Sequence, residues 1–352
     1  MILGSIILSL VLASTATAGV MPGLLAWRAA NAVGIEGFRV TFLTGATPTN
    51  IVLHASYAEP AVAASALYDS GDGNWTAYTS RTIPVVGDYV AFKGDWRNAA
   101  GGYAYMFGVT FQSAAYTCKF NGALENTPSA FGSCYREIFR DCTAVVSIED
   151  NPLPILTGAP ATYMFYTACY NMSGVTGALP TGFLDTSGLT GAPAVSMFHR
   201  ACYNMSGVTG ALPAGFLDAS GLTGVPAASM FHQACYNMSG VTSLPTGFLD
   251  TSGLTGVPAT YMFYAACYNM SGATNAYTFA ISSNVTFDAV NVGTSATVGP
   301  LASAWRGMVN WPGTVMWGTN VLFSAIAPSN RIYSIEGSTN VPGYAGFDAN
   351  WK

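Results

Sequence analysis

The sequence predicts a mainly β protein with a repeat solenoid and an apolar N-terminal helix. Three observations lead to this class. Four cysteines recur within copies of one unit, at steps of 33, 33 and 32 residues. Gly and Pro interrupt every copy, which excludes long helices there, and residues 1–27 carry no charge. In chain order we expect an apolar helix over 1–34, a β-sandwich-like domain over 36–115, a solenoid of about 33-residue units over 116–275, and a β-rich C-terminal region over 276–352.

The uncharged N-terminal segment has three interpretations. Its apolar run and Ala16-Thr17-Ala18 are typical of a secretory signal peptide, and its length also suits a transmembrane anchor. It further resembles the polymerisation helix of mature type IV pilins, which starts uncharged and often has a proline where Pro22 stands, although Ser5 replaces the usual glutamate. That resemblance implies an assembly helix with Met1, Ser5 and Pro22, through which copies of the chain associate.

The segment that follows reads as a β-domain. Strand candidates are Phe38–Leu43, Trp75–Tyr78 and Tyr89–Phe92, because β-branched and aromatic residues are dense there and turn residues lie between them. The stretch Asp69–Asn74, rich in Gly and Asp, is either a small cation loop or a hairpin turn, and hairpins are the commoner use of such residues.

The repeats give the strongest signal in the chain. The unit reads M-F-x-x-A-C-Y-N-M-S-G-V-T-x-L-P-x-G-F-L-D-x-S-G-L-T-G-x-P-A, and the copies begin at Met164, Met197, Met230 and Met262. A degenerate first copy lies around Ile138–Cys142, as expected for a terminal repeat. We expect each unit to hold a short helical or 3₁₀ turn at M-F-x-x-A-C, a short strand at V-T and a turn at L-P-x-G-F-L-D.

The motifs M-F-x-x-A-C-Y-N-M-S-G and F-L-D-T-S-G-L-T-G resemble the bacterial-surface-protein-A-like variant of leucine-rich repeats over residues 134–280. This resemblance implies a leucine-rich-repeat-like stack, surface display and adhesion, without catalysis.

Residues at one phase of stacked repeats form columns. Asp185, Asp218 and Asp250 are either calcium ligands or, as we prefer, acceptors for their own turn backbone in the D-x-S-G context. His199 and His232 share a phase with Tyr166 and Tyr264, which favours a half-buried aromatic position over a metal site.

A third column combines tyrosines with asparagines. Its tyrosines are either a flat aromatic strip that binds sugar rings or a partner subunit, or they are core: Tyr170, Tyr203, Tyr236 and Tyr268. Each is followed by an N-M-S glycosylation sequon. With two further sequons, the candidate glycosylation sites are Asn74, Asn171, Asn204, Asn237, Asn269 and Asn284.

Composition restricts the function. Only 8% of residues are charged, against about 25% in ordinary domains, and no basic run suits nucleic acid. The seven cysteines form no C-x-x-C pair, so we expect buried small hydrophobes. Trp305, Trp311 and Trp317 form either a carbohydrate platform or core packing. No catalytic motif is present, so we expect no enzyme and no cofactor, with calcium the one ion considered.

The sequence therefore predicts an extracellular structural protein at the cell surface. It would be a subunit of a pilin-like surface filament or of a surface layer, displaying its repeats for adhesion. The alternative is a monomeric adhesin, secreted or membrane-anchored, that binds glycan or host surface polymers.

Overall fold

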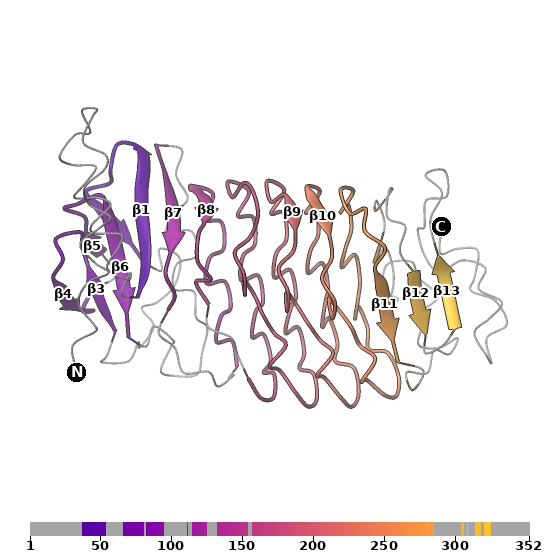
Figure 1. Cartoon of the computed structure of the whole chain (residues 1–352). Coiled ribbons are helices and arrows are strands. Elements are labelled where there is room, and N and C mark those ends of the chain that lie inside the picture. The colour runs from indigo at the N-terminus through magenta and orange to yellow at the C-terminus, as the bar shows by residue number, and fades with distance from the viewer. Residues whose placement is uncertain are drawn as a thin grey trace, which may run out of the picture. The chain divides into compact units, whose positions relative to one another are not determined.

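The computed structural model describes residues 37–53, 66–80, 82–94, 111, 115–124, 132–153, 157–282, 284, 304–305, 308, 314–317 and 320–324 (Figure 1). The chain divides into two compact units, Met1–Glu36 and Gly37–Lys352, and every described residue belongs to the second. The expected assembly helix, with Met1, Ser5 and Pro22, lies outside the described residues.

A six-stranded sheet opens this unit, in the order β4-β3-β6-β1-β7-β8. Its strands are β1 (Phe38–Gly45), β3 (Leu67–Asp69), β4 (Trp75–Ala77), β6 (Tyr89–Lys93), β7 (Tyr116–Asn121) and β8 (Val145–Ile148). A separate pair joins β2 (Asn50–Val52) to β5 (Thr82–Pro84). The three strands expected from the sequence correspond to β1, β4 and β6 and are confirmed.

Alternation along β1 gives the sheet an apolar and a polar face. Phe38, Val40 and Phe42 are buried in the core, whereas Arg39 and Thr41 between them point to the opposite face and are half-buried. Because side chains alternate along a strand, this pattern fixes which face packs inward.

The sheet continues directly into the repeats. Strand β8 lies in the degenerate first copy and pairs in parallel with β7, where Cys118 is opposite Val145. Strand β7 also pairs with β1, where Val40 is opposite Phe120, so backbone hydrogen bonding runs across the boundary that the sequence suggested between 115 and 116.

Successive repeats lie side by side, joined by backbone hydrogen bonds (Figure 1). In the M-F-x-x-A-C segment every second N–H group donates to the next repeat, as in Phe165 N to Met197 O (2.8 Å) and Cys169 N to Ala201 O (2.7 Å). The residues between them close turns within the repeat, as in Ala168 N to Phe165 O (3.1 Å).

This segment is not helical, because its backbone turns left-handed at every fourth residue. Tyr163, Thr167 and Asn171 have φ of 58°, 49° and 57°, whereas an α-helix needs negative φ throughout. The same spacing at Ser133 and Asp141, with Glu137 between them, confirms the degenerate first copy.

The expected fold class is therefore wrong. The described residues contain no helix, so the short helical turns expected at M-F-x-x-A-C are absent, and these residues form neither a solenoid nor a closed sheet. The expected N-terminal helix lies outside them. A leucine-rich-repeat stack needs a parallel strand in every repeat. Here the repeats pair through isolated bridges such as Gly158 with Leu189, and only β9 (Gly210–Ala211) and β10 (Val241–Ser243) pair as strands. Gly and Pro keep the remaining segments too short for ladders.

The C-terminal part adds a small sheet. Strand β11 (Thr278–Ile281) pairs in parallel with β12 (Thr314–Trp317), which pairs antiparallel with β13 (Asn320–Ser324). Ile281 also bridges to Thr251, so β11 continues the hydrogen bonding of the repeats.

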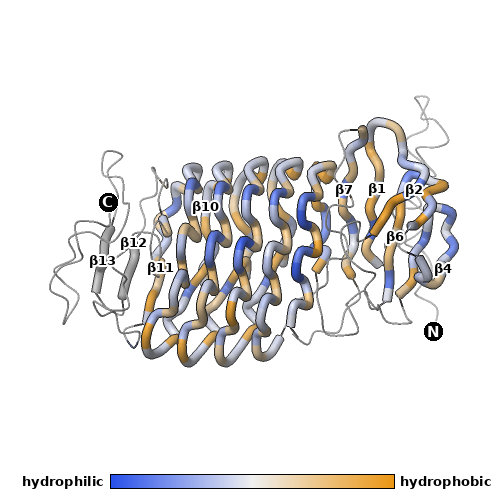
Figure 2. Tube along the Cα trace, turned by 180° about the vertical axis from the view of Figure 1, so that it is seen from behind, coloured by the Kyte–Doolittle hydropathy of each residue, from blue (hydrophilic) through white to orange (hydrophobic). Residues whose placement is uncertain are grey.

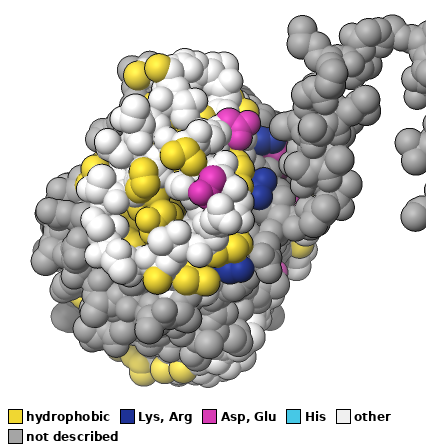
Figure 3. All heavy atoms as spheres, turned by 90° about the vertical axis from the view of Figure 1, so that its left-hand side faces the viewer, with side chains coloured by type: hydrophobic (Ala, Val, Ile, Leu, Met, Phe, Trp, Pro, Cys, Tyr) yellow, Lys and Arg dark blue, Asp and Glu magenta, His cyan; other side chains and the backbone are white. Residues whose placement is uncertain are grey.

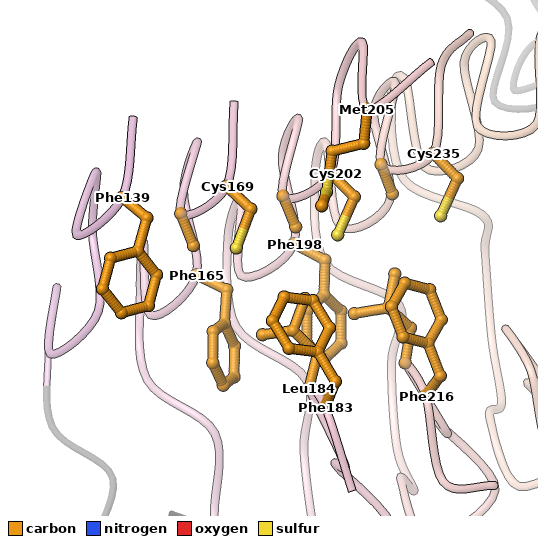
Figure 4. Close-up of a cluster of buried hydrophobic side chains, with 14 of the residues drawn as sticks. Phe139, Phe165, Cys169, Phe183, Leu184, Phe198, Cys202, Met205, Phe216 and Cys235 are labelled. Carbon is orange, nitrogen blue, oxygen red and sulfur yellow. The ribbon is translucent and has the colours of Figure 1, made fainter. Parts of the chain in front are cut away.

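The core of the repeats consists of columns of identical side chains (Figure 4). Phe165, Phe198 and Phe231 stack with ring centroids 5.6 and 5.4 Å apart. Cys169 and Cys202 form a second column beside them (Figure 4), and all seven cysteines are buried, as expected, and none is in a disulfide. Each repeat thus buries its apolar side chains against copies of themselves.

Among the described residues there is no helix long and apolar enough to cross a membrane.

Candidate functional site: the aromatic face of the repeats

The segment that begins each repeat contributes one residue to each of three parallel columns, and these columns face one side. We call their combined surface the aromatic face. The tyrosine column contains Tyr170, Tyr203, Tyr236 and Tyr268; the histidine column contains Tyr166, His199, His232 and Tyr264; the asparagine column contains Asn171, Asn204, Asn237 and Asn269. All twelve are half-buried, beside the fully buried Phe and Cys columns. In Figure 2 the hydrophilic positions of successive repeats lie in line.

The tyrosine rings stack nearly parallel. Ring centroids are 4.9 Å apart for Tyr170 and Tyr203, with planes at 11°, and 4.6 Å for both Tyr203–Tyr236 and Tyr236–Tyr268, with planes at 9° and 3°. The faces of the inner rings therefore cover one another. What the column offers to a partner is ring edges and hydroxyl groups, so a sugar cannot lie flat on an inner ring.

The asparagine side chains form one continuous hydrogen-bonded ladder. Asn269 donates through Nδ2 to Oδ1 of Asn237, Asn237 to Asn204, and Asn204 to Asn171, each at 2.7 Å. Asn171 donates to the Asp141 carboxylate at 2.9 Å. The ladder therefore has one direction and ends on a charged acceptor in the degenerate first copy, where the bond is stronger than between neutral amides.

This ladder separates the six sequons into two groups. In the four repeat asparagines Nδ2, the atom that carries an N-linked glycan, is already a donor in the ladder. Asn74 and Asn284 are exposed. Glycosylation stays a prediction at all six, and at the repeat positions the one hydrogen left on Nδ2 would have to keep the ladder bond.

The histidine column places two imidazoles next to each other, with their planes tilted by 44°. The centroids of His199 and His232 lie 4.4 Å apart, Tyr166 is 4.7 Å from His199, and Tyr264 is 5.0 Å from His232. Burial, with smaller contributions from His232 to His199 and from Arg200 to both, lowers the pKa of His199 to about 3 and that of His232 to about 4. Both rings are therefore neutral near pH 7, which agrees with the expected aromatic position.

Two arginines of the degenerate first copy lie at the ends of the histidine and tyrosine columns. The sequence alone did not identify them. The Arg136 guanidinium lies 4.9 Å from the ring centroid of Tyr166, and that of Arg140 lies 5.6 Å from Tyr170. Aligning the degenerate copy with the next repeat would have found them, because Arg136 and Arg140 occupy the phases of Tyr166 and Tyr170.

The recurring aspartates Asp185, Asp218 and Asp250 are turn acceptors. Oδ1 of Asp185 accepts from Ser187 N at 3.0 Å, that of Asp218 from Ser220 N at 2.9 Å, and that of Asp250 from Ser252 N at 2.8 Å. This confirms the preferred interpretation. The part of the chain that the structure describes holds no group of three or more metal-binding side chains, and calcium is therefore not assigned.

The Asp69–Asn74 stretch is a hairpin loop between β3 and β4. The Asp69 carboxylate accepts the N–H groups of Gly71 (2.9 Å), Asp72 (3.2 Å) and Gly73 (3.0 Å) through Oδ1, and the Tyr89 hydroxyl through Oδ2 at 2.7 Å. Its oxygens organise the loop backbone, as in the hairpin interpretation.

The described residues show no platform formed by the three tryptophans. Trp305 is buried, with its ring centroid 5.4 Å from that of Phe279. Trp311 lies outside the described residues, and Trp317 ends β12.

No protein-family model, curated protein or solved structure matches this chain.

Proposed function

We propose that this chain is a non-enzymatic extracellular structural protein of a cell surface, a subunit of a surface filament or layer whose repeats provide an adhesive face. The observation that supports it best is the regular spacing of the aromatic face, where tyrosine rings repeat every 4.6–4.9 Å. A surface that repeats the same groups at a constant step suits a partner that also repeats, either a polymer or an array of copies of the chain.

The charge of the repeats favours an uncharged partner. Residues 157–282 contain four charged side chains: Asp185, Arg200, Asp218 and Asp250. The three aspartates bond their own turns, and Arg200 Nε donates to Gln233 Oε1 at 2.7 Å. Tyrosine hydroxyls and amide groups therefore dominate the aromatic face, and these groups match the hydroxyl groups of a neutral polysaccharide.

A catalytic role has little support from the groups that could perform it. His199 and His232 pack against aromatic rings and have pKa values far below neutrality, whereas a general base works best with a pKa near the operating pH. Burial raises the pKa of the Cys118 thiol to about 12, and reactive cysteines have lowered pKa values.

Pull-down of the full chain with insoluble cellulose, chitin and starch tests the adhesive role. We expect at least one polymer to retain the protein, equally at 0.1 and 1 M NaCl, because an uncharged contact is not screened by salt. The double variant Tyr203→Phe/Tyr236→Phe keeps the ring stack and removes two hydroxyls, so it should bind several-fold more weakly. Asp72→Asn, in the exposed hairpin loop, is the matched control and should bind normally.

Sedimentation velocity over a wide concentration range tests the structural role, for which we expect concentration-dependent association. A chain that stays monomeric at all concentrations and is retained by none of the polymers contradicts the proposal.

A further inference from the structure

Strands β7 and β8 bring three chemically complementary residues together on one face of the six-stranded sheet. Lys119 and Asn121 lie two positions apart in β7, so their side chains leave the strand on the same side, opposite to the core residue Phe120. Glu149 follows β8 directly, and its backbone N–H donates to Phe120 O at 2.9 Å. The glutamate is therefore held beside the residue that separates the lysine from the asparagine. Figure 3 faces the sheet end of the molecule and shows basic and acidic side chains close together on one side.

The Glu149 carboxylate forms hydrogen bonds with both side-chain nitrogens. Nζ of Lys119 donates to Oε1 at 2.8 Å and to Oε2 at 3.0 Å, and Nδ2 of Asn121 donates to the same Oε2. Two nitrogens that share one acceptor oxygen are separated by no more than two hydrogen-bond lengths, about 6 Å. The amide carbon Cγ is bonded directly to Nδ2, so the lysine amine reaches it by rotation within its own flexible side chain.

The amide of Asn121 has one orientation in this network. An ionised carboxylate only accepts hydrogen bonds, so the amide nitrogen must face Glu149 and the amide oxygen must turn away from it. If the lysine amine attacks Cγ, Nδ2 is the leaving nitrogen. That nitrogen is already in contact with a group that can carry protons to it.

Solvent reaches these residues unequally. Asn121 is 5% exposed and the side chain of Lys119 is 17% exposed, whereas that of Glu149 is 46% exposed. Water therefore has little access to the amide carbon, which disfavours hydrolysis relative to attack by the neighbouring amine. The exposed side of Glu149 gives a released ammonium ion a route to solvent.

We propose that Lys119 and Asn121 are joined by an isopeptide bond, and that Glu149 is the catalytic residue for its formation. Glu149 first accepts a proton from Nζ, and the neutral amine then attacks Cγ. The Nζ–Cγ bond forms and the Cγ–Nδ2 bond breaks while Glu149 passes protons to Nδ2. Of the three hydrogens on the lysine ammonium, one stays in the new amide and two leave with Nδ2 as ammonium. One amide replaces another, so the reaction needs no oxidant, reductant or cofactor.

The fold supplies the reactivity that an ordinary amide lacks. Strand β7 pairs in parallel with β8, where Lys119 is opposite Ser147, so the amine, the amide and the carboxylate stay together for as long as the chain is folded. Well-oriented intramolecular reactions reach effective concentrations of about 10⁵–10⁸ M. The bond closes a small ring within β7 and is independent of the adhesive role proposed for the repeats.

A competing nucleophile lies next to the same amide. The backbone nitrogen of Gly122 follows Asn121, and its attack on Cγ would also release ammonia, with formation of a succinimide. That N–H group donates to Oδ2 of Asp150 at 2.9 Å. Because this hydrogen bond fixes the direction of the peptide group, the lysine amine is the better-placed nucleophile.

Peptide mapping of the full chain by mass spectrometry tests the proposal without any variant. Trypsin does not cleave after an acylated lysine. We therefore expect one peptide over residues 98–136 that is uncut at Lys119 and lighter than its sequence by one ammonia. Fragmentation of that peptide should assign the linkage to Lys119 and Asn121, and normal cleavage after Lys93 is the internal control.

Three variants identify the groups that react. Lys119→Arg and Asn121→Ala should each give peptides of the full sequence mass. Glu149→Gln keeps the shape of the side chain but removes the proton carrier, so it should slow cross-linking about a hundredfold or more. Asp150→Asn, whose amide oxygen can still accept from Gly122, is the matched control and should cross-link like the natural chain. Circular dichroism checks that each variant is folded.

The proposal is overturned if trypsin cleaves the natural chain after Lys119 and both resulting peptides have their full sequence mass. The three residues would then form only an ion pair with an amide hydrogen bond. It is also overturned if the loss of ammonia persists in Lys119→Arg, which would place a succinimide at Asn121 and Gly122. Cross-linking of Glu149→Gln at the natural rate would likewise overturn it. None of these results bears on the adhesive role of the repeats.

Discussion

The Arg140 guanidinium lies over the ring of Tyr170, 5.6 Å from its centroid, and so ends the tyrosine column with a charge. The ring of Tyr170 is covered on one side by Tyr203. A tyrosine in place of Arg140 would cover the ring of Tyr170, but the outer face of its own ring would then be uncovered. The guanidinium instead covers the last ring and keeps its own polar groups near solvent.

We expect Arg140→Met to lower the free energy of unfolding by about 1 kcal/mol, mainly through the lost cation–π contact. The side chain is 38% exposed, so its ion pairs with Glu137 and Asp141 add little. Urea denaturation measures the change. Arg140→Lys should recover part of it, and a Met variant as stable as the natural chain contradicts a capping role.

The asparagine ladder predicts a difference between inner and end positions. Asn204 donates to Asn171 and accepts from Asn237, whereas for Asn269 the one ladder bond is its donation to Asn237. Asn204→Gly should therefore cost about 1–3 kcal/mol and Asn269→Gly about 0.5–1.5 kcal/mol in urea denaturation.

Glycine is the appropriate substitute at both positions. Asn204 and Asn269 have φ of 61° and 59°, a conformation that glycine adopts without strain, so the backbone contribution is matched. Equal losses for the two variants would show that the ladder does not act as a connected unit.

The histidine pair predicts loss of stability in acid. The pKa values of His199 and His232, about 3 and about 4 in the folded chain, lie below the ordinary value of 6.5. The unfolded chain therefore binds more protons between these values, and stability falls as pH drops below about 6.5. The slope should approach about 1.4 kcal/mol per pH unit for each histidine.

Thermal unfolding of the full chain from pH 7 to pH 4 measures this slope. The double variant His199→Tyr/His232→Tyr introduces the residue that occupies the same phase in the flanking repeats, and it should lose most of the dependence between pH 6.5 and 4. If the double variant kept the same dependence of stability on pH, groups other than these two histidines would cause the acid sensitivity.

The buried cysteines predict complete protection of the thiols in the folded chain. All seven are buried and outside any disulfide, and burial raises the pKa of Cys142 and Cys267 well above the ordinary range, so thiolate is scarce. A colorimetric thiol reagent at pH 8 should react with none of them in the native protein and with seven in guanidinium chloride. Reaction of a native thiol would identify a repeat that opens locally.

Periodicity in the sequence located those features of the fold that depend on residues close together along the chain. The cysteine steps located the four clear copies, the residue pattern suggested the degenerate one around Ile138–Cys142, and the D-x-S-G context correctly assigned Asp185 to its own turn. The dense β-branched and aromatic residues of Phe38–Leu43 likewise located β1. These features could be predicted because each depends on local turn chemistry or on a strand period.

The backbone between the repeats could not be predicted in the same way. M-F-x-x-A-C was expected to form a helical turn, but left-handed residues such as Thr167 direct alternate N–H groups to the next repeat. A local motif does not reveal whether an N–H group bonds within its own turn or to a residue about 32 positions away.

By itself the sequence determined the repeat length, the columns and the near absence of charge, because all three depend on which residues recur at which step. Only the tertiary structure decided what each column does. In the structure the faces of the tyrosine rings cover one another, and the Asn amides form a ladder that ends at Asp141. Arg39 lies opposite Asn121 of the neighbouring strand. Hydrogen bonds and ring contacts depend on distances between residues remote in sequence, and those distances are set by the packing of whole repeats and strands.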